Sequence, residues 1–264
     1  ANPVANPPVT TSFIVTGTDA LGCVDTDTVV VTVRNLPVVT ASSDTAICGS
    51  GAVQLSVKPN TGGTYIWTPS TGLNSTNISN PVATINATTE YFVTYTDANG
   101  CKNLDSVTIT VNAVPTVSTR SDTSICSGAS ITLITTGTGN TYAWSPPTGL
   151  NNVNTKSPIA KPSITTKYIV TTTSAQGCTN KDSVIVTVWP IPQVNANGDT
   201  TICGSGYAQL NANATGATSY SWSPSFFLSN PNISNPLANP DTTTIYKVTA
   251  ISEDGCANTD SVLV

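Results

Sequence analysis

The sequence has no histidine and no methionine, and only 9% of its 264 residues are charged. Without histidine, neither a His-based catalytic triad nor a His general base can form. Glutamate occurs only at Glu90 and Glu253, and most aspartates stand beside Thr or Ser where turns are expected. We therefore expect a protein that is not an enzyme, with no catalytic residues and no cofactor.

Positive charge and long hydrophobic runs are also scarce. The nine Lys and Arg residues are scattered singly in a chain of net charge −5, whereas a nucleic-acid-binding surface needs clustered positive charge. No apolar run approaches the roughly 18 residues of a membrane-spanning helix. The paired CxxC motifs of a zinc site are absent. The composition thus argues against nucleic-acid partners, direct membrane insertion and a metal site.

What the sequence does contain is a repeat. The stretch from Thr64 to Asn80 (TYIWTPSTGLNSTNISN) has a close copy from Thr141 and a looser copy from Ser219. The tryptophans of the three copies, 77 and 78 residues apart, are Trp67, Trp144 and Trp222. A fixed period of this size indicates a tandem array. We expect each of these tryptophans to be the centre of a module's core.

Thr, Ser, Asn, Val, Pro and Gly dominate the composition, and no stretch shows helical periodicity, so an all-β fold is predicted. Apolar residues alternate at Tyr91, Val93 and Tyr95, as expected of a half-buried strand, and 97–100 (DANG) is a hairpin signal. Tyr91 and its copies, Tyr168 and Tyr246, follow a Thr-rich turn where the tyrosine corner of an immunoglobulin-like sandwich would sit. An ordinary core aromatic is an equally good interpretation of these tyrosines.

The repeat divides the chain into one partial and three whole modules. We call them module I (1–36, the C-terminal half of a repeat), module II (37–113), module III (114–190) and module IV (191–264). The chain begins within a repeat, so we expect a fragment or a processed form in which module I exposes half a core. The linkers are short and contain proline, which restricts the backbone. We expect the modules to stack end to end in a semi-rigid rod longer than about 100 Å.

The combined motif W-x-P-x-T-G-L, N-P-x-A, T-T-x-Y-x-V, G-C and D-S-V-x-V-x-V resembles the PKD-like and Ig-like repeats of Bacteroidota surface proteins. The resemblance covers the whole chain and departs from the pattern at Phe226-Phe227, which replace Thr-Gly. Such repeats occur in very long adhesins that are exported by type IX secretion, including gliding-motility proteins. The resemblance implies tandem immunoglobulin-like (PKD-like) β-sandwich modules in an extracellular, cell-surface protein, without identifying a ligand.

The seven cysteines keep strict register, which suggests disulfides and an oxidising compartment. In one scheme they pair within modules, as Cys48–Cys101, Cys126–Cys178 and Cys203–Cys256. In a sandwich, however, the two cysteines of a module lie at opposite ends, roughly 33 Å apart, whereas a disulfide needs Cα atoms within roughly 7 Å. We therefore favour pairing between modules, as Cys48–Cys178 and Cys126–Cys256, with Cys23, Cys101 and Cys203 either paired with modules outside the fragment or unpaired.

Asp followed by Ser or Thr recurs through the chain and resembles the O-glycosylation sequon of Bacteroidota secreted proteins. An unmodified Asp-Ser at the start of a strand explains the pattern equally well. Because Ser106 precedes the core residue Val107, its side chain should point outward. The candidate glycosylation sites are Thr28, Thr45, Ser106, Ser183, Thr200, Thr242 and Ser261.

The function that follows is structural: a disulfide-stiffened, O-glycosylated spacer in a long extracellular adhesin or filament, whose partners are the neighbouring repeats of the same chain. One alternative is a carbohydrate-binding or adhesive module that contacts surface polysaccharide through the loops at 70–80 and their copies. A carbohydrate site would normally show exposed aromatic rings in those loops, and only module IV has them, at Phe226 and Phe227. A third hypothesis is a self-assembling filament subunit in which another copy of the chain completes module I.

Overall fold

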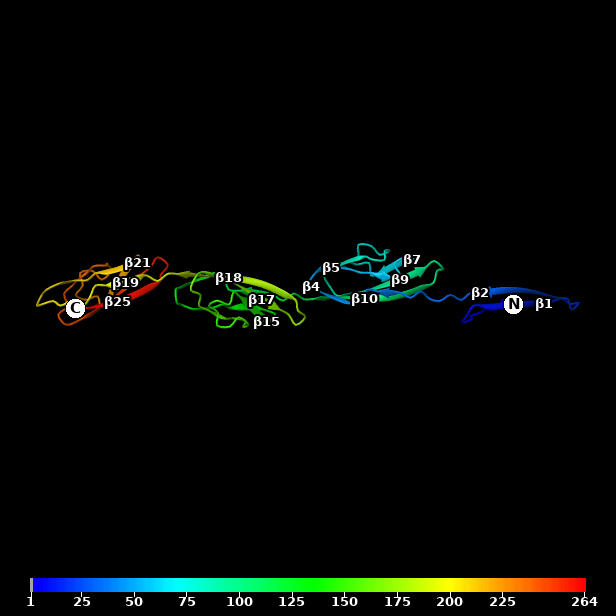
Figure 1. The fold of residues 1–264 in the computed structure, drawn as a ribbon, viewed down its shortest axis with the longest axis horizontal. Coiled ribbons are helices and arrows are strands. Elements are labelled where there is room, and N and C mark those ends of the chain that lie inside the picture. Colours follow the sequence, from blue (N-terminus) through cyan, green and yellow to red (C-terminus); the bar gives the residue numbers. More distant parts are fainter. Residues whose placement is uncertain (1) are drawn as a thin grey trace. The chain divides into compact units, whose positions relative to one another are not determined.

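The computed structural model describes residues 2–264, and every regular element in that range is a β-strand (Figure 1). The chain divides into two compact units, Ala1–Val114 and Pro115–Val264. Every hydrogen-bonded sheet uses strands from a single predicted module. The all-β prediction is thus confirmed, and the strands belong to sandwich modules with separate cores.

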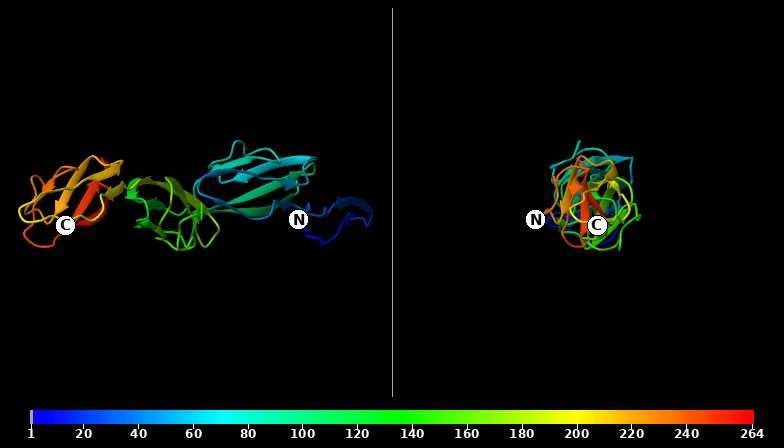
Figure 2. Two further views of the ribbon diagram at one scale, coloured as in Figure 1. Left: turned by 60° about the vertical axis from the view of Figure 1, so that its left-hand side comes forward. Right: turned by 90° about the vertical axis from the view of Figure 1, so that its left-hand side faces the viewer.

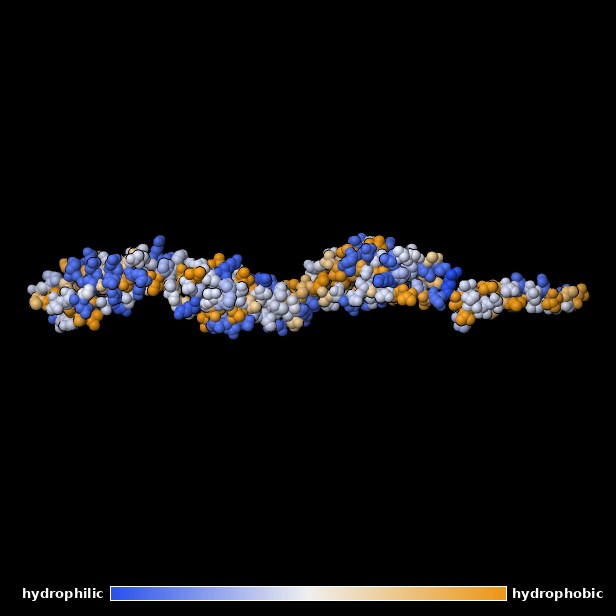
Figure 3. All heavy atoms as spheres, in the orientation of Figure 1, coloured by the Kyte–Doolittle hydropathy of each residue, from blue (hydrophilic) through white to orange (hydrophobic). Residues whose placement is uncertain are grey.

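Module I is a single antiparallel hairpin of β1 (Thr11–Thr18) and β2 (Val24–Val31). Phe13 pairs with Val29 across the hairpin, and the two side chains are 38% and 61% exposed. The equivalent residues of module II, Tyr91 and Val107, are fully buried. Hydrophobic side chains therefore reach the surface of this hairpin, as Figure 3 shows in orange.

Module II has two layers. Its larger sheet has the order β4-β10-β9-β7, and two short ladders, β3-β6 and β5-β8, form the second layer. Strand β4 runs parallel to β10, and the other pairs are antiparallel. The strands are β3 (Thr40–Ala41), β4 (Thr45–Cys48), β5 (Gly51–Gln54), β6 (Val57–Lys58), β7 (Gly63–Thr68), β8 (Val82–Ile85), β9 (Thr89–Asp97) and β10 (Lys102–Asn112).

Strand alternation decides which side chains enter the core of module II. Tyr91, Val93 and Tyr95 point inward along β9 and are at most 4% exposed, whereas Phe92 between them is 42% exposed. This is the period of two expected when one face of a sheet is buried. At the end of β9 the predicted hairpin forms, and Asp97 accepts hydrogen bonds from the backbone N–H groups of Asn99 (2.8 Å) and Cys101 (2.9 Å).

Modules III and IV repeat this order within the second unit, and Figure 2 shows their sheets from two further sides. Module III forms the sheets β12-β18-β17-β15, β11-β14 and β13-β16, and module IV forms β22-β24-β25, β19-β21 and β20-β23. The strands of module III are β11 (Val117–Thr119), β12 (Thr123–Cys126), β13 (Ile131–Thr132), β14 (Thr135–Gly137), β15 (Thr141–Ser145), β16 (Ile159–Ala160), β17 (Thr166–Thr173) and β18 (Thr179–Trp189). Those of module IV are β19 (Gln193–Ala196), β20 (Ala208–Gln209), β21 (Ala212–Thr215), β22 (Ser219–Ser223), β23 (Leu237–Ala238), β24 (Ile245–Ile251) and β25 (Ala257–Leu263).

The repeated tryptophan is at the centre of each core, as predicted. Trp67, Trp144 and Trp222 are 1%, 4% and 2% exposed. Each indole N–H donates to a backbone carbonyl eleven residues further along the chain, at distances of 2.9 to 3.1 Å. The ring therefore fills the core, and its polar edge fixes the long loop that follows its strand.

The repeated tyrosine is buried but does not form a tyrosine corner. Its hydroxyl donates to a carbonyl twenty residues upstream, in the loop after the tryptophan strand: Tyr91 to Thr71 (2.6 Å), Tyr168 to Thr148 (2.7 Å) and Tyr246 to Phe226 (3.3 Å). A tyrosine corner would instead bond the backbone a few residues upstream. The tyrosine and the tryptophan thus hold the two ends of the same loop.

Candidate functional site: disulfide and carboxylate contacts of the repeats

The two cysteines of a module lie at opposite ends of its last strand. In module III, Cys178 directly precedes β18, and Cys126 is paired beside Trp189 at the other end of that strand. Eleven residues of β18 separate these points, which corresponds to about 36 Å. Cys101 and Cys48 are related in the same way by β10. This geometry does not allow a disulfide within a module.

The structure instead joins consecutive modules. Cys126 of module III and Cys256 of module IV form a disulfide with a Cα–Cα distance of 5.6 Å and a sequence separation of 130. The within-module alternative is wrong at each position: Cys126 and Cys256 bond each other, and Cys101 and Cys203 are free thiols. Cys256 is fully buried.

The remaining cysteines differ in state. Cys48 and Cys178 are each disulfide-bonded. Cys23 and Cys203 are free and exposed, and Cys101 is free and half-buried. The free thiols are those that the between-module scheme leaves without a partner.

Aspartates that the sequence assigned to turns hold the first and last strands of each module together. In module II, Asp105 on β10 accepts a hydrogen bond from the N–H of Ala41 on β3 (2.8 Å). Conversely, Asp44, just before β4, accepts a hydrogen bond from the N–H of Thr108 on β10 (2.8 Å). The same pair of contacts recurs in the other whole modules, through Asp182 and Asp122 and through Asp260 and Asp199.

These contacts are charge-assisted, because an ionised carboxylate accepts from a backbone donor. Hydrogen bonds to charged groups each contribute about 1.5–3 kcal/mol to stability. They link β10 to Ala41 and Asp44, which lie outside the register in which β4 pairs with β10. Sequence reasoning missed them, although the recurrence of Asp at two positions 60 or 61 residues apart in every whole module was a signal that could have found them.

A further contact fixes each linker to the module that it enters. The amide Nδ2 of Asn103 donates to the carbonyl of Pro37, that of Asn180 to Pro115 and that of Asn258 to Pro192, each at 2.9 Å. The linker carbonyl is thereby held on the last strand of its own module. Each Pro-containing linker is thus anchored by a side chain about 65 residues away.

The tyrosines buried in the module cores have a raised pKa. Burial raises the pKa of Tyr91, Tyr168 and Tyr246 above the ordinary value, and nearby Asp241 adds to the effect at Tyr246. Burial, together with the proximity of Tyr95, also raises the pKa of Tyr65. These groups are structural, since their hydroxyls bond to loop carbonyls.

The hydroxyls of the Asp-Ser and Asp-Thr pairs differ in accessibility. Thr28, Thr45, Thr242 and Ser261 are exposed, whereas Ser106, Ser183 and Thr200 are half-buried. At Ser106, Ser183 and Ser261 the backbone N–H donates to the preceding aspartate. The aspartate of each pair therefore has a structural role whether or not the hydroxyl is modified.

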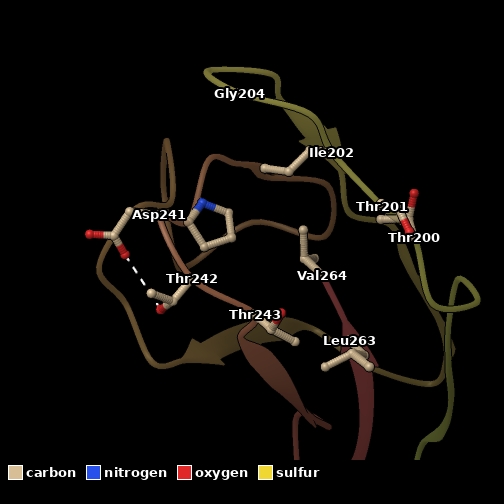
Figure 4. Close-up of a pocket in the computed structure, with 10 residues that line it drawn as sticks. Thr200, Thr201, Ile202, Gly204, Asp241, Thr242, Thr243, Leu263 and Val264 are labelled. Atoms are coloured by element: carbon tan, nitrogen blue, oxygen red, sulfur yellow. Dashed lines mark hydrogen bonds between the residues drawn. The ribbon is translucent and has the colours of Figure 1, made fainter.

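A cavity of about 430 Å³ opens at the end of module IV, beside Val264 (Figure 4). In module II the equivalent of Val264 is Ile109, and β10 continues beyond it to pair with β4. The cavity is therefore the space that about three further residues of the last strand would fill. Its lining is Thr200, Thr201, Ile202, Gly204, Pro240, Asp241, Thr242, Thr243, Leu263 and Val264.

Within the described part of the chain, His, Cys, Asp and Glu side chains do not gather in groups of three or more that could hold a metal ion. Among residues 2–264 there is no helix with the length and hydropathy required to cross a membrane.

Comparison with known proteins agrees with this architecture. Residues 35–115 match the family model described as "Ig-like domain CHU_C associated". The chain is built of tandem Ig-like modules. The match coincides with module II and so covers one of the three whole modules. No protein of curated function matches the chain at a significant level.

Solved structures resemble the chain only distantly. A Ca²⁺-stabilised adhesin with which an Antarctic bacterium binds ice is 17% identical, over 97% of this chain and 80% of that chain, with a TM-score of 0.31. Extracellular domains 3–5 of Drosophila OTK are 12% identical over 84% and 93%, with a TM-score of 0.32. Mouse cadherin-23 EC22–24 is 12% identical over 86% and 98%, with a TM-score of 0.31. Likeness at this level carries no information about function.

Proposed function

We propose that this chain is a spacer segment of a long extracellular surface protein, an adhesin or a filament, in which modules I–IV are consecutive repeats. The observation that carries the proposal is the disulfide between Cys126 and Cys256, which ties one module to the next. Anchored proline linkers add support, because they restrict bending where modules meet. Export by type IX secretion and a part in gliding motility are what the motif resemblance adds.

The same scheme assigns the partners of the other cysteines. We propose that Cys48 is bonded to Cys178, and that Cys23, Cys101 and Cys203 bond cysteines of further repeats in the parent protein. Successive modules would then be linked covalently along the whole spacer. Non-reducing peptide mapping tests this assignment: it predicts a cross-linked peptide pair containing Cys48 and Cys178, and a Cys48–Cys101 pair would overturn it.

Stretching the chain from its ends tests the spacer role. In the fully reduced chain the segment from Cys126 to Cys256, with a sequence separation of 130, contributes up to about 470 Å to the extended length at 3.6 Å per residue. We expect single-molecule force spectroscopy to show a much shorter final extension for the oxidised chain than for the fully reduced chain, with the Cys126→Ala variant in between because Cys48 and Cys178 remain bonded. Equal extensions of the oxidised and reduced chains, or full extension of the oxidised chain at low force, would refute a role in bearing tension.

We also propose O-glycosylation at the Asp-Ser and Asp-Thr sites, with exposed Thr28, Thr45, Thr242 and Ser261 as the best acceptors. An exposed hydroxyl is what a glycosyltransferase requires, and a chain with few charges gains solubility from sugar. Intact-mass analysis of protein from its native source should show hexose-containing additions that disappear when these four residues are changed to Ala. A mass equal to that of the bare polypeptide would refute the proposal.

A self-assembling filament is a second candidate, favoured by the open face of module I. Phe13, Val29 and residues of the preceding segment line a cavity of about 630 Å³ there. Residues equivalent to Phe13 and Val29 are fully buried in the complete modules. Sedimentation velocity distinguishes the candidates: a filament subunit associates as concentration rises and a Phe13→Ser variant does not, whereas a simple spacer stays monomeric.

A further inference from the structure

Module IV displays three large exposed aromatic side chains where the other whole modules have small ones. Tyr207 is 70% exposed, Phe226 is 57% exposed and Phe227 is 47% exposed. Counting from the conserved spacing of the cysteine and the tryptophan, the equivalent residues are Ala52, Thr71 and Gly72 in module II and Ser130, Thr148 and Gly149 in module III. Of these three, only Phe226 and Phe227 stand out in the sequence, where they replace Thr-Gly of the repeat.

Strand pairing brings Tyr207 to the same edge as the two phenylalanines. Ala208 pairs with Ala238, and Ala238 also forms a bridge to Leu228. One residue further along each antiparallel pair, Asn239 lies opposite Tyr207 on one side and opposite Phe227 on the other. Asn239 is therefore between the two aromatic residues. Because neighbouring strands are about 4.8 Å apart, the backbones of Tyr207 and Phe227 lie about 10 Å from each other.

Asn239 ties the two aromatic loops together. Its backbone N–H donates to the carbonyl of Phe227 (2.9 Å), and its side-chain amide donates to the carbonyl of Gly206. The backbone bond recurs in the other modules, where Thr84 donates to Gly72 and Lys161 to Gly149. The amide side chain of Asn239 therefore adds a second link to the loop that carries Tyr207.

The two phenylalanines are held in a fixed and strained arrangement. Their ring centroids are 5.5 Å apart with planes nearly perpendicular. Phe227 has a φ of 62°, at the position where Gly72 and Gly149 also have positive φ. A left-handed backbone costs a residue with a side chain about 1–2 kcal/mol. Such strain persists mainly at functional sites, and here its effect is to display a ring at the surface.

In module III, the positions equivalent to Tyr207, Phe226 and Phe227 are not buried by the module that follows. Ser130, Thr148 and Gly149 of module III are exposed, although module IV follows in the same compact unit. Aromatic rings at the equivalent places in module IV would therefore remain accessible in a longer array. The rings are available to an external partner.

The size and chemistry of the surface favour a sugar chain as that partner. Three aromatic side chains at these exposures present about 350 Å², well below the roughly 800 Å² per partner of a stable protein interface. Flat rings match the apolar C–H faces of pyranoses, and the loop around Phe226 and Phe227 is rich in Ser and Asn, which hydrogen-bond to hydroxyls. We propose that Tyr207, Phe226 and Phe227 form a binding surface for neutral polysaccharide, a binding function beyond that of a spacer.

The test uses a variant that copies the other modules. Tyr207→Ser, Phe226→Thr and Phe227→Gly together recreate the residues of module III and remove the strain at Phe227, so module IV should remain folded. Phe92→Thr, at an exposed aromatic on β9 of module II, is the matched control. Binding is measured by affinity gel electrophoresis against hydroxyethylcellulose, xylan, mannan and mixed-linkage β-glucan, with thermal unfolding to verify the fold.

We expect the parent chain and the Phe92→Thr control to be retarded by at least one of these polysaccharides. The triple variant should bind at least tenfold more weakly while unfolding at the same or a higher temperature. No retardation of the parent chain by any of the four, or retardation unchanged in the triple variant, would overturn the proposal. Loss of self-association in the triple variant, without sugar binding by the parent, would make the surface a protein contact and would also overturn it.

Discussion

The disulfide between Cys126 and Cys256 allows its contribution to stability to be worked out. It closes a loop with a sequence separation of 130, for which the chain-entropy relation gives about 5 kcal/mol at 25 °C. If module III stays folded while module IV unfolds, the free loop shrinks to the 66 residues between Pro190 and Cys256 (256 − 190), and the relation gives about 4 kcal/mol. Measured disulfides more often contribute about 2–4 kcal/mol.

We therefore expect Cys126→Ala to destabilise module IV by about 2–4 kcal/mol, which lowers its melting temperature by roughly 10–20 °C for a domain of this size. Cys126 is a better position to change than Cys256, because Cys126 is half-buried and the buried sulfur of Cys256 keeps its packing. Urea denaturation followed by tryptophan fluorescence and circular dichroism measures the change. Cys23 and Cys101 are changed to Ser in every sample to prevent disulfide exchange, and Cys203 is kept so that it can be removed separately.

Two comparisons make the result decisive. Reducing the parent protein should lower the stability of module IV by a similar amount, and reducing the Cys126→Ala variant should change that transition little. Cys203→Ala, which removes an exposed free thiol near the end of the same module, should leave stability within about 0.5 kcal/mol. If Cys126→Ala is as mild as Cys203→Ala, the disulfide does not constrain module IV and the reasoning fails.

Three further outcomes follow from the contacts described above. Asp182→Ala should destabilise module III by about 1.5–3 kcal/mol, because the N–H of Thr119 loses a charged acceptor; Asp241→Ala, at an exposed turn, is the control for urea denaturation. Appending Thr-Val-Asn after Val264, to copy the end of β10, should stabilise module IV by about 1–2 kcal/mol through burial of the valine, whereas Thr-Asp-Asn should not. Burial raises the pKa of Tyr168 in the folded state, so the unfolded chain loses the phenolic proton of Tyr168 at a lower pH than the folded chain does. The free energy of unfolding should therefore stay constant below about pH 10 and fall above it. Melting temperatures from pH 8 to 11.5 should fall less steeply in Tyr168→Phe, and an identical fall would contradict the assignment.

The sequence predicts the fold because its signals are local. Alternation at Tyr91, Val93 and Tyr95 and the Asp97–Gly100 turn each depend on a few neighbouring residues, and both appear as predicted. The position of the tryptophans follows from a repeat that can be counted directly.

Contacts between distant residues could not be predicted in this way. Asp105 meets Ala41, 64 residues away, only because the first and last strands of a module lie side by side. Tyr91 bonds a loop carbonyl because the long loop folds back over the core. Tyr207 joins Phe226 and Phe227 through strand pairing centred on Ala238, a residue without any chemical signal of its own.

The most direct test of the spacer account is small-angle X-ray scattering of the oxidised chain in solution. Modules of roughly 33 Å joined end to end make a rod longer than about 100 Å, with a radius of gyration of about 30 Å or more. A compact particle of this chain length would have a radius of gyration of about 18 Å. We predict the larger value, with a scattering curve that fits one extended form. The compact value, or a curve that requires a broad mixture of bent and straight forms, would contradict the account.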